Sequence, residues 1–309
     1  MRAVRSAPPS VTVVDVEAPS GPGEVVRIRS AGICASDFTY IGYGFTMLLG
    51  HELAGETEDG TPVAIEALFG CGECEQCVQG HVNLCVLGPT ALGVTSDGGM
   101  SEYFAAPASA LVPLPAGLAA ADACIVEPAS VAWHACRIAG AGPDLRVAVI
   151  GGGAIGLLAA ASAKRMGAAE VSIEVRHPHQ REVAEHIGAT ETSGHYDVVI
   201  EAAGTESALY RATEVARPGG TMAVLGVFPP GVPWPQHECF MKELRTVPSL
   251  GYCRHSVGRD FEDAAAMLAA DPDLVDALIT HRFPIEDAAE AFRVASDKST
   301  GALRVVIEP

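Results

Sequence analysis

Short apolar segments separated by glycine and proline run up to about residue 115. Segments such as VTVVDVEAP, TPVAIEAL and ALVPLPAG alternate apolar with polar positions and end at turn residues. Alternation of this kind is typical of strands that bury one face. We therefore expect an antiparallel, β-rich lobe with irregular loops in this part of the chain.

Longer apolar stretches with helix-forming residues begin near residue 120. The segment LRVAVIGGGAIGLLAAASAKRMGAAEVSIEV indicates a strand, a glycine turn, a helix and a strand. Such a βαβ unit predicts a parallel sheet. We expect further strands in YDVVIEAAG and GGTMAVLGV, with helices at 179–187 and 205–216 between them. Near the end, RDFEDAAAMLAA and IEDAAEAFRVA predict helices and GALRVVIEP predicts a closing strand.

A glycine turn joins the first strand of the βαβ unit to its helix. Gly151, Gly153 and Gly156 have G-x-G-x-x-G spacing, and the expected helix begins with Ala154 and Ile155. In this pattern the first glycine permits a tight turn, the second lets a pyrophosphate approach the backbone, and the third lets the helix pack closely on the strand. The helix N-terminus attracts the diphosphate. The context predicts a dinucleotide site, with a plain structural corner as the alternative.

Four of the nine cysteines lie in the segment FGCGECEQCVQGHVNLC: Cys71, Cys74, Cys77 and Cys85. They predict either a disulfide framework or a metal site. The cysteine count is odd, and the first residues, MRAVRSAPPSVTVVDV, lack the apolar core and cleavage site of a secretory signal, so we expect a cytoplasmic protein. In that reducing setting the x2, x2, x7 spacing favours a structural zinc held by four thiolates, which would stabilise a lobe without catalysing a reaction.

Composition and net charge limit which kinds of molecule the protein could bind. The chain has 309 residues, 49% of them hydrophobic and 19% charged, which is enough for a sizeable core. A formal net charge of -18 argues against a nucleic-acid or anionic-membrane partner, because both need clustered Lys and Arg. The apolar run LLAAASA at 157–163 is too short to cross a bilayer, so we expect no membrane segment.

A second set of candidate ligands flanks the cysteine-rich segment. Cys34 lies in AGICASDFTY, His51 and Glu52 lie in LLGHELAGE, and Glu127 lies in CIVEPASVAWHAC. Thiolate, imidazole and carboxylate ligands together suit a zinc ion that keeps one position for a substrate oxygen. Each residue taken alone has an ordinary structural alternative, such as a buried cysteine, a loop histidine or a surface carboxylate.

Taken in order, G-I-C-x-S-D, G-H-E, the four-cysteine lobe, E-P and G-x-G-x-x-G resemble the zinc-dependent medium-chain alcohol dehydrogenases. IVEPASVAWHAC is similar to the branch that contains sorbitol, threonine and related polyol or amino-alcohol dehydrogenases. The resemblance covers essentially the whole chain. It implies an α/β fold with a β-rich GroES-like catalytic domain at 1–125 and 272–309. A doubly wound parallel-sheet (Rossmann) domain would occupy 126–271.

The resemblance also implies roles for the candidate ligands. Cys34 and His51 would bind a catalytic zinc, and Glu52 or Glu127 would supply the third protein ligand. Two further residues complete the implied catalytic set. They are Asp37, which would orient the zinc-bound histidine, and Ser36, whose hydroxyl would begin the proton relay beside the substrate oxygen. The zinc would lower the pKa of an alcohol, and hydride would pass from the carbinol carbon to the nicotinamide.

This chain departs from the family pattern around the substrate site. Thr39 stands where many members carry a relay histidine, GTPV replaces G-D-R-V, and the spans from Cys34 to His51 and from His51 to Cys71 are short. The substrate is therefore not transferred from any relative. Candidate lining residues lie in the segment after the G-I-C-x-S-D motif: Tyr40, Tyr43, Phe45 and Met47.

The choice of dinucleotide rests on the end of the second expected strand. Val175 stands where the family places its ribose-binding acid, and Arg176 follows it. An arginine beside a missing acid accommodates a 2′-phosphate, so we expect NADP(H) to be preferred over NAD(H). The alternative is that Glu174 reaches the ribose, although neighbouring strand residues face opposite sides. Other candidate cofactor contacts lie in the next two expected strands: Ala203 and Gly226.

The predicted function is that of an oxidoreductase acting on a secondary alcohol, polyol or amino alcohol, or on the matching ketone. Two alternatives are a biosynthetic ketone or aldehyde reductase of the same family and a noncatalytic zinc- and dinucleotide-binding protein. Family members pair the edge strands of their nucleotide sheets, so a homodimer or homotetramer is expected. GGTMAVLGV and the proline-rich VFPPGVPWP would supply that edge and its cover.

Overall fold

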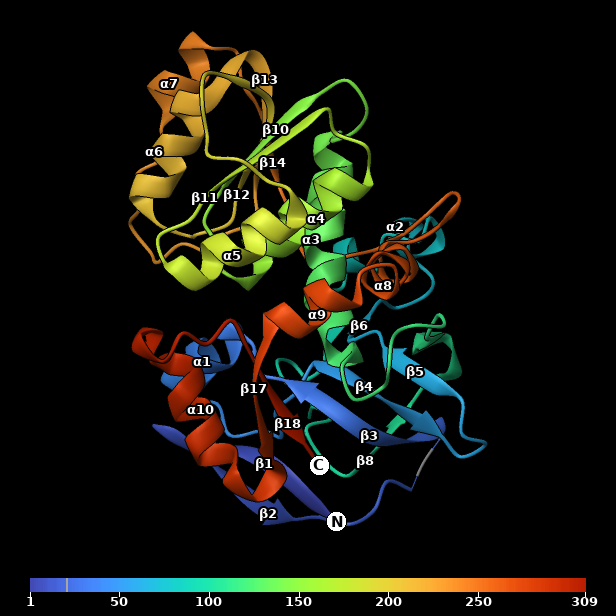
Figure 1. The fold of residues 1–309 in the computed structure, drawn as a ribbon. Coiled ribbons are helices and arrows are strands. Elements are labelled where there is room, and N and C mark those ends of the chain that lie inside the picture. The colour runs from blue at the N-terminus through green and yellow to red at the C-terminus, as the bar shows by residue number, and fades with distance from the viewer. Residues whose placement is uncertain (21) are drawn as a thin grey trace. The chain divides into compact units, whose positions relative to one another are not determined.

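Residues 1–20 and 22–309 are described by the computed structural model, and they divide into two units (Figure 1). The first unit comprises Met1–Glu127 and Cys253–Pro309, and the second comprises Pro128–Tyr252. The predicted boundary between residues 271 and 272 differs from this division. Residues from 253 onward join the first unit because the side chains of Arg254 and Arg259 both bind Glu66 and the Ser109 carbonyl oxygen.

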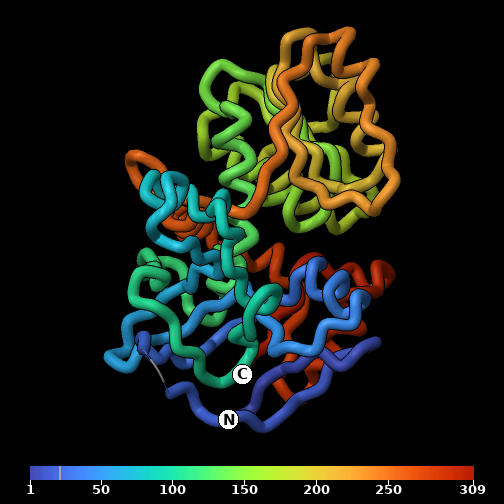
Figure 2. The backbone as a smooth tube through the Cα atoms, turned by 180° about the vertical axis from the view of Figure 1, so that it is seen from behind, coloured from blue at the N-terminus to red at the C-terminus, as the bar shows by residue number. Residues whose placement is uncertain are grey.

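A seven-stranded sheet organises the first unit. Its main path runs β17 (Ile279–Pro284), β18 (Arg304–Glu308), β3 (Glu24–Gly32), β4 (Glu52–Thr57), β5 (Pro62–Ile65) and β9 (Leu111–Pro113), and β8 (Tyr103–Ala106) also pairs with β3. All pairs are antiparallel except β17 with β18, which confirms the expected β-rich lobe. The C-terminal strand β18 lies in this sheet, and both chain termini belong to this unit (Figure 2).

Alternating burial on these strands builds the core of the first unit. Val26 and Ile28 of β3 face the same interior as Leu53 of β4 and Ile65 of β5. Helix α10 (Ala288–Ser296) covers this core together with the β1–β2 hairpin (Arg2–Ala7 and Ser10–Asp15). Phe292 of α10 packs edge-on against a ring from α1 (Ala35–Gly42), with centroids 5.5 Å apart. This packing fixes α1, which carries Ser36 and Asp37 and begins directly after Cys34.

Shorter elements complete the first unit. The cysteine-rich segment forms β6 (Leu68–Phe69), α2 (Glu75–Val78), the 3₁₀ helix η1 (Val82–Leu84) and β7 (Thr90–Ala91). The hairpin of β15 (Arg254–His255) and β16 (Gly258–Arg259) runs alongside this segment, as Figure 2 shows, and Arg254 N donates to the Gly80 carbonyl. The remaining helices are η2 (Ala108–Ala110), η3 (Ala123–Ile125), α8 (Asp260–Ala269), α9 (Pro272–Leu278), η4 (Ile285–Asp287) and η5 (Lys298–Thr300).

The second unit is built on a five-stranded parallel sheet. The strand order is β11 (Glu170–Glu174), β10 (Arg146–Ile150), β12 (Tyr196–Glu201), β13 (Ala216–Val224) and β14 (Arg245–Pro248). The unit's helices are most of α3 (Val126–Ala139), α4 (Ala154–Arg165), α5 (Pro178–Ile187), α6 (Glu206–Val215) and α7 (Gln236–Met241). Figure 1 shows α4 and α6 on opposite sides of the strands. The doubly wound α/β fold is therefore confirmed.

The edge of this sheet differs from the one predicted. The segment GGTMAVLGV lies in β13, which bonds to β12 on one side and to β14 on the other, so it is not an edge strand. The edge strand on that side is β14, which has only four residues and no long apolar run, so the hydrophobic pattern did not reveal it. None of the helices in the described ranges combines the length and apolar character that a bilayer crossing requires.

Candidate zinc and dinucleotide sites

The first site is organised by helix α1. Cys34 is the residue immediately before the helix, and its backbone N–H donates to Asp37 Oδ2 at 2.9 Å. A carboxylate in the first turn that bonds back to the residue before the helix fixes the start of the helix. Asp37 is fully buried and Ser36 lies between the two. The start of one short helix and the residue before it therefore hold three of the predicted catalytic residues in a fixed arrangement.

His51, at the start of β4, completes this arrangement from the sheet side. Its Nδ1 lies 3.7 Å from Asp37 Oδ1, and its Nε2 lies 3.3 Å from Ser36 Oγ. The possible ligand atoms of Cys34, His51 and Glu52 lie within 4.8 Å of one another. Three of these buried polar atoms have no hydrogen-bond partner among the described residues: Asp37 Oδ1, His51 Nδ1 and Glu52 Oε1. A cluster of under-satisfied thiol, imidazole and carboxylate groups fits a zinc ion.

Charges in this cluster act strongly on each other. Burial alone would raise the pKa of the Cys34 thiol, but the charge and hydrogen bond of His51 lower it to about 7. Burial would lower the pKa of His51, yet the charges of Cys34 and Asp37 raise it to about 10. A thiolate is therefore already favoured at this position. Since metal ligands must be deprotonated, a divalent cation would displace the proton held by His51.

Two carboxylates compete for the third ligand position. Glu52 is fully buried and forms an ion pair with Arg304 of β18, which is also buried. Burial raises the pKa of Glu127 to about 8, although the nearby charge of His51 opposes that rise. Both predicted acids therefore belong to this cluster, and Glu52 is the one within ligand distance of Cys34 and His51.

Arg304 was not found from the sequence. It lies in GALRVVIEP, where it stands between the residues GAL and the apolar run VVI, and it forms the partner of Glu52. A charged residue at a buried strand position is costly unless it is paired, so this charge was the available signal. Of the predicted aromatic residues, Tyr40 lies in α1 and Phe45 follows it, and their rings stack at 5.7 Å. Burial, followed by the charges of Cys34 and Asp37, raises the pKa of Tyr40.

The four-cysteine lobe converges as predicted. The sulfur atoms of Cys71, Cys74, Cys77 and Cys85 lie within 4.8 Å of one another. Backbone N–H groups donate to the sulfurs, as from Cys71 to Cys85 Sγ at 3.4 Å and from Cys74 to Cys71 Sγ at 3.3 Å. Backbone donors lower the pKa of Cys74 to about 6. Four thiols with backbone donors fit a closed, structural zinc site.

The glycine turn follows β10 and leads into α4. Gly151 has φ +123, and a Cβ atom there would lie 2.9 Å from Ala203, so this position requires glycine. A Cβ on Gly156 would overlap the Gly151 carbonyl oxygen. Gly153 precedes the first helical residue, Ala154, and a Cβ there would meet no atom within 4 Å. The first and last glycines are therefore needed for packing, whereas the middle one leaves open space where a phosphate would approach.

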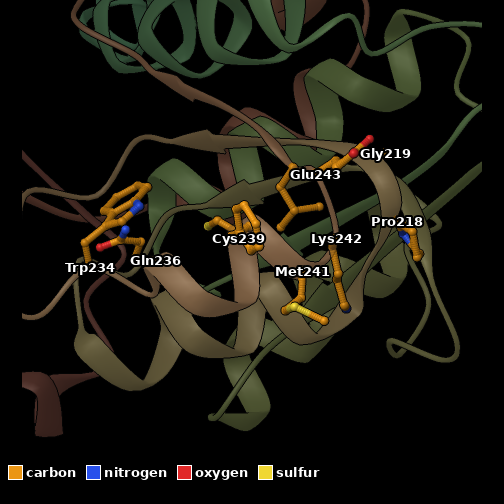
Figure 3. Close-up of a pocket in the computed structure, with 10 residues that line it drawn as sticks. Pro218, Gly219, Trp234, Gln236, Cys239, Met241, Lys242 and Glu243 are labelled. Carbon is orange, nitrogen blue, oxygen red and sulfur yellow. The ribbon is translucent and has the colours of Figure 1, made fainter.

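The remaining predicted cofactor residues lie at the same edge of the sheet. Val175 and Arg176 follow β11, and Val175 lies against Gly152 of the turn. Ala203 and Gly226 follow β12 and β13. The carboxyl ends of parallel strands share one edge, which is where open α/β sheets bind ligands. A separate hollow of about 870 Å³ lies around α7, lined by residues such as Trp234 and Phe240, and it includes none of the predicted site residues (Figure 3).

Comparisons with known proteins identify the family of the chain. Residues 21–116 match the alcohol dehydrogenase GroES-like domain family, and residues 120–308 match the glucose dehydrogenase C-terminus family. Sorbitol dehydrogenase 1 of Saccharomyces cerevisiae is 30% identical over 86% of this chain and 85% of that protein.

Solved structures agree as well. A zinc-binding dehydrogenase from Sinorhizobium meliloti, bound to NADP, is 29% identical, with a TM-score of 0.85 over 100% of this chain and 99% of that one. An alcohol dehydrogenase from Escherichia coli CFT073, complexed with NADH, is 25% identical, with a TM-score of 0.88 over the same shares of the two chains.

Proposed function

Because the chain belongs to the zinc-type medium-chain alcohol dehydrogenases, and is therefore an oxidoreductase that uses a nicotinamide cofactor, we propose that its substrate is a polyol or sugar alcohol. The protein would oxidise a secondary carbinol or reduce the matching ketone. The observation that carries this proposal is the convergence of Cys34, His51 and Glu52 beside the Ser36 hydroxyl. The similarity to a sorbitol dehydrogenase favours a polyhydroxylated substrate over a simple alcohol.

The residues of the first unit define the mechanism. Cys34 and His51, with Glu52 or Glu127, would hold the catalytic zinc. When bound, zinc supplies a Lewis acid that lowers the pKa of an alcohol, and the nicotinamide accepts a hydride. Asp37 orients the His51 ring through Nδ1. Ser36 Oγ lies beside the ring and is placed to accept the alcohol proton, so the chain needs no histidine at Thr39 to begin the relay.

We further propose that NADP(H) is preferred over NAD(H). The position of the ribose-binding acid is occupied by Val175, and the side chain of Arg176 is exposed beside it. The Glu174 carboxylate accepts bonds from Arg211 Nε at 2.8 Å and from Thr192 Oγ1 at 2.7 Å. These bonds engage Glu174 away from the ribose position, which weakens the alternative that it acts as the missing acid. A free guanidinium without a competing carboxylate suits a 2′-phosphate.

A homodimer or homotetramer remains our proposal for the assembly. Strand β14 offers unpaired backbone groups at the edge of its sheet among the described strands. Large apolar side chains near this edge are exposed, with Phe240 at 76% and Met241 at 65%. A second copy that extends the sheet would cover them. The acidic net charge continues to argue against a nucleic-acid partner.

A cytoplasmic location is also part of the proposal. All nine cysteines, which fall within the described residues, are free thiols. Both proposed zinc sites need reduced cysteines to bind metal, and a reducing compartment keeps them so.

The experiment that tests the function combines metal analysis with a substrate screen. We expect two zinc ions per chain and nicotinamide reduction with polyols such as sorbitol. Cys34→Ala should remove one zinc and abolish turnover with little change in the unfolding temperature, because an open catalytic site contributes less to folding than a closed one. Cys77→Ala, the matched control in the structural site, should lower the unfolding temperature by at least ~5 °C. Full activity in Cys34→Ala would refute the proposed mechanism, and zinc binding without any turnover would favour a noncatalytic role.

A further inference from the structure

Glu201 is a buried carboxylate that the reaction described above does not use. It is the last residue of β12, and its side chain is fully buried. In the sheet it stands in register between Ile150, which precedes the glycine turn, and Val224, the last residue of β13. The crossover helices leave in opposite directions from β10 and β12, so this end of β12 is the switch point at which doubly wound sheets bind ligands.

The carboxylate bonds directly to the loop that follows β12. Glu201 Oε1 accepts from the backbone N–H groups of Ala203 and Gly204, both at 2.9 Å. The main-chain oxygen of the same residue accepts from Leu225 at 2.9 Å and from Gly226 at 3.1 Å. One residue therefore joins the loop after β12 to the loop after β13.

The two loops touch each other directly above this carboxylate. A Cβ atom on Gly226 would overlap both Glu201 Oε2 and the backbone nitrogen of Gly204. Gly204 itself has φ +64, and a Cβ on it would lie 2.7 Å from the Val227 carbonyl oxygen. Side chains are thus excluded at both positions, and the backbone closes over the acid.

The same contacts extend to the glycine turn. A Cβ on Gly151 would lie 2.9 Å from the backbone nitrogen of Ala203, which is one of the groups that Glu201 holds. A shift of the loop after β12 would therefore alter the wall against which the turn packs. Burial raises the pKa of Glu201, and the backbone donors oppose that rise. A buried acid is costly unless hydrogen-bond donors converge on it. The bonds of Glu201 therefore hold the loop that carries those donors in one position.

We propose that Glu201 is a positioning residue for the dinucleotide, which holds the loops after β12 and β13 in the conformation that receives the nicotinamide half of the cofactor. The inference rests on the proposed cofactor site at the glycine turn. Glu201 is not among the residues proposed to hold the zinc or to accept the alcohol proton. Its loss should weaken cofactor binding while leaving the chemical step intact once the cofactor is bound.

The test is Glu201→Leu, which keeps the approximate size of the side chain but removes the oxygen that accepts from the N–H groups of Ala203 and Gly204. Binding of NADPH and NADH to the zinc-loaded protein is measured by nucleotide fluorescence, with no need for the alcohol substrate. We expect Kd for both nucleotides to rise about tenfold, since one buried acceptor is lost. KM for the cofactor should rise in parallel and kcat at saturation should stay within about twofold.

Glu170→Leu is the matched control. Glu170 lies at the opposite end of the same sheet, where it binds Arg146 at 2.8 Å, so its change should leave both Kd values unaltered. Gly226→Ala perturbs the same contact from the other loop and should weaken binding as Glu201→Leu does, even if one of the two variants folds poorly. Wild-type affinity in both Glu201→Leu and Gly226→Ala would overturn the inference. Wild-type protein that binds neither nucleotide would overturn the proposed function itself.

Discussion

The chemistry of the first site is set by contacts between single residues. Asp37 bonds to the backbone of Cys34 and faces His51, and Ser36 Oγ meets the other ring nitrogen. The resemblance of G-I-C-x-S-D and G-H-E to the family motifs implied these residues. Arg304 could not be predicted in this way, because its partner Glu52 lies on another strand and only the folded sheet brings the two together.

Arg176 carries the first prediction at this scale. Arg176→Ala should lower kcat/KM for NADPH about tenfold, because a charge-assisted bond to the 2′-phosphate is lost, and should change kcat/KM for NADH less than about twofold. Initial-rate kinetics with both cofactors measure the ratio. The matched control is Arg181→Ala, since Arg181 is ion-paired with Glu191 and should leave the ratio unchanged. A wild-type enzyme that uses NADH at least as efficiently as NADPH would show the cofactor proposal to be wrong.

The elements show where sequence reasoning succeeds and where it stops. The strand, glycine turn and helix from residue 146 to 165 were predicted because a long apolar pattern and three glycines specify one local structure. Strand β14 was missed because four residues at a sheet edge carry little hydrophobic pattern. The segment 253–271 was assigned to the nucleotide-binding domain, because the sequence does not show the ion pairs that join it to the distant residue Glu66. Strand pairs and ion pairs between distant residues depend on both partners, and the sequence around one partner does not identify the other.

The glycine turn gives a prediction at the scale of an element. Gly156→Ala should lower the free energy of unfolding by about 2 kcal/mol, because the new methyl group would overlap the Gly151 carbonyl oxygen. Gly153→Ala should leave unfolding within about 0.5 kcal/mol, because that Cβ would meet open space, yet it should weaken cofactor binding by hindering the pyrophosphate. Urea unfolding and nucleotide titration separate the two effects. Equal losses of stability in the two variants would contradict this division of roles.

At the scale of the whole molecule, apolar side chains of α7 are exposed although the protein as a whole is acidic. Phe240 and Met241 are mostly exposed, and the hollow beside them is lined by Trp234 and Cys239 (Figure 3). Monomeric proteins rarely expose such groups together. A net charge of -18 would otherwise keep copies of the chain apart, so any association must come from a local apolar contact of this kind.

Assembly through this surface is the prediction at the largest scale. Phe240→Asp should shift the protein toward monomer, because a charge at a contact that excludes water would lose its hydration. Light scattering at micromolar concentration measures the mass, and thermal unfolding of the dilute protein checks that the unit itself is intact. Val257→Asp is the matched control, since Val257 is 90% exposed on the β15–β16 hairpin of the other unit and its change should leave the mass unaltered. A wild-type protein that is monomeric under these conditions would refute the assembly, whereas an oligomer that survives Phe240→Asp would place the contact elsewhere on the molecule.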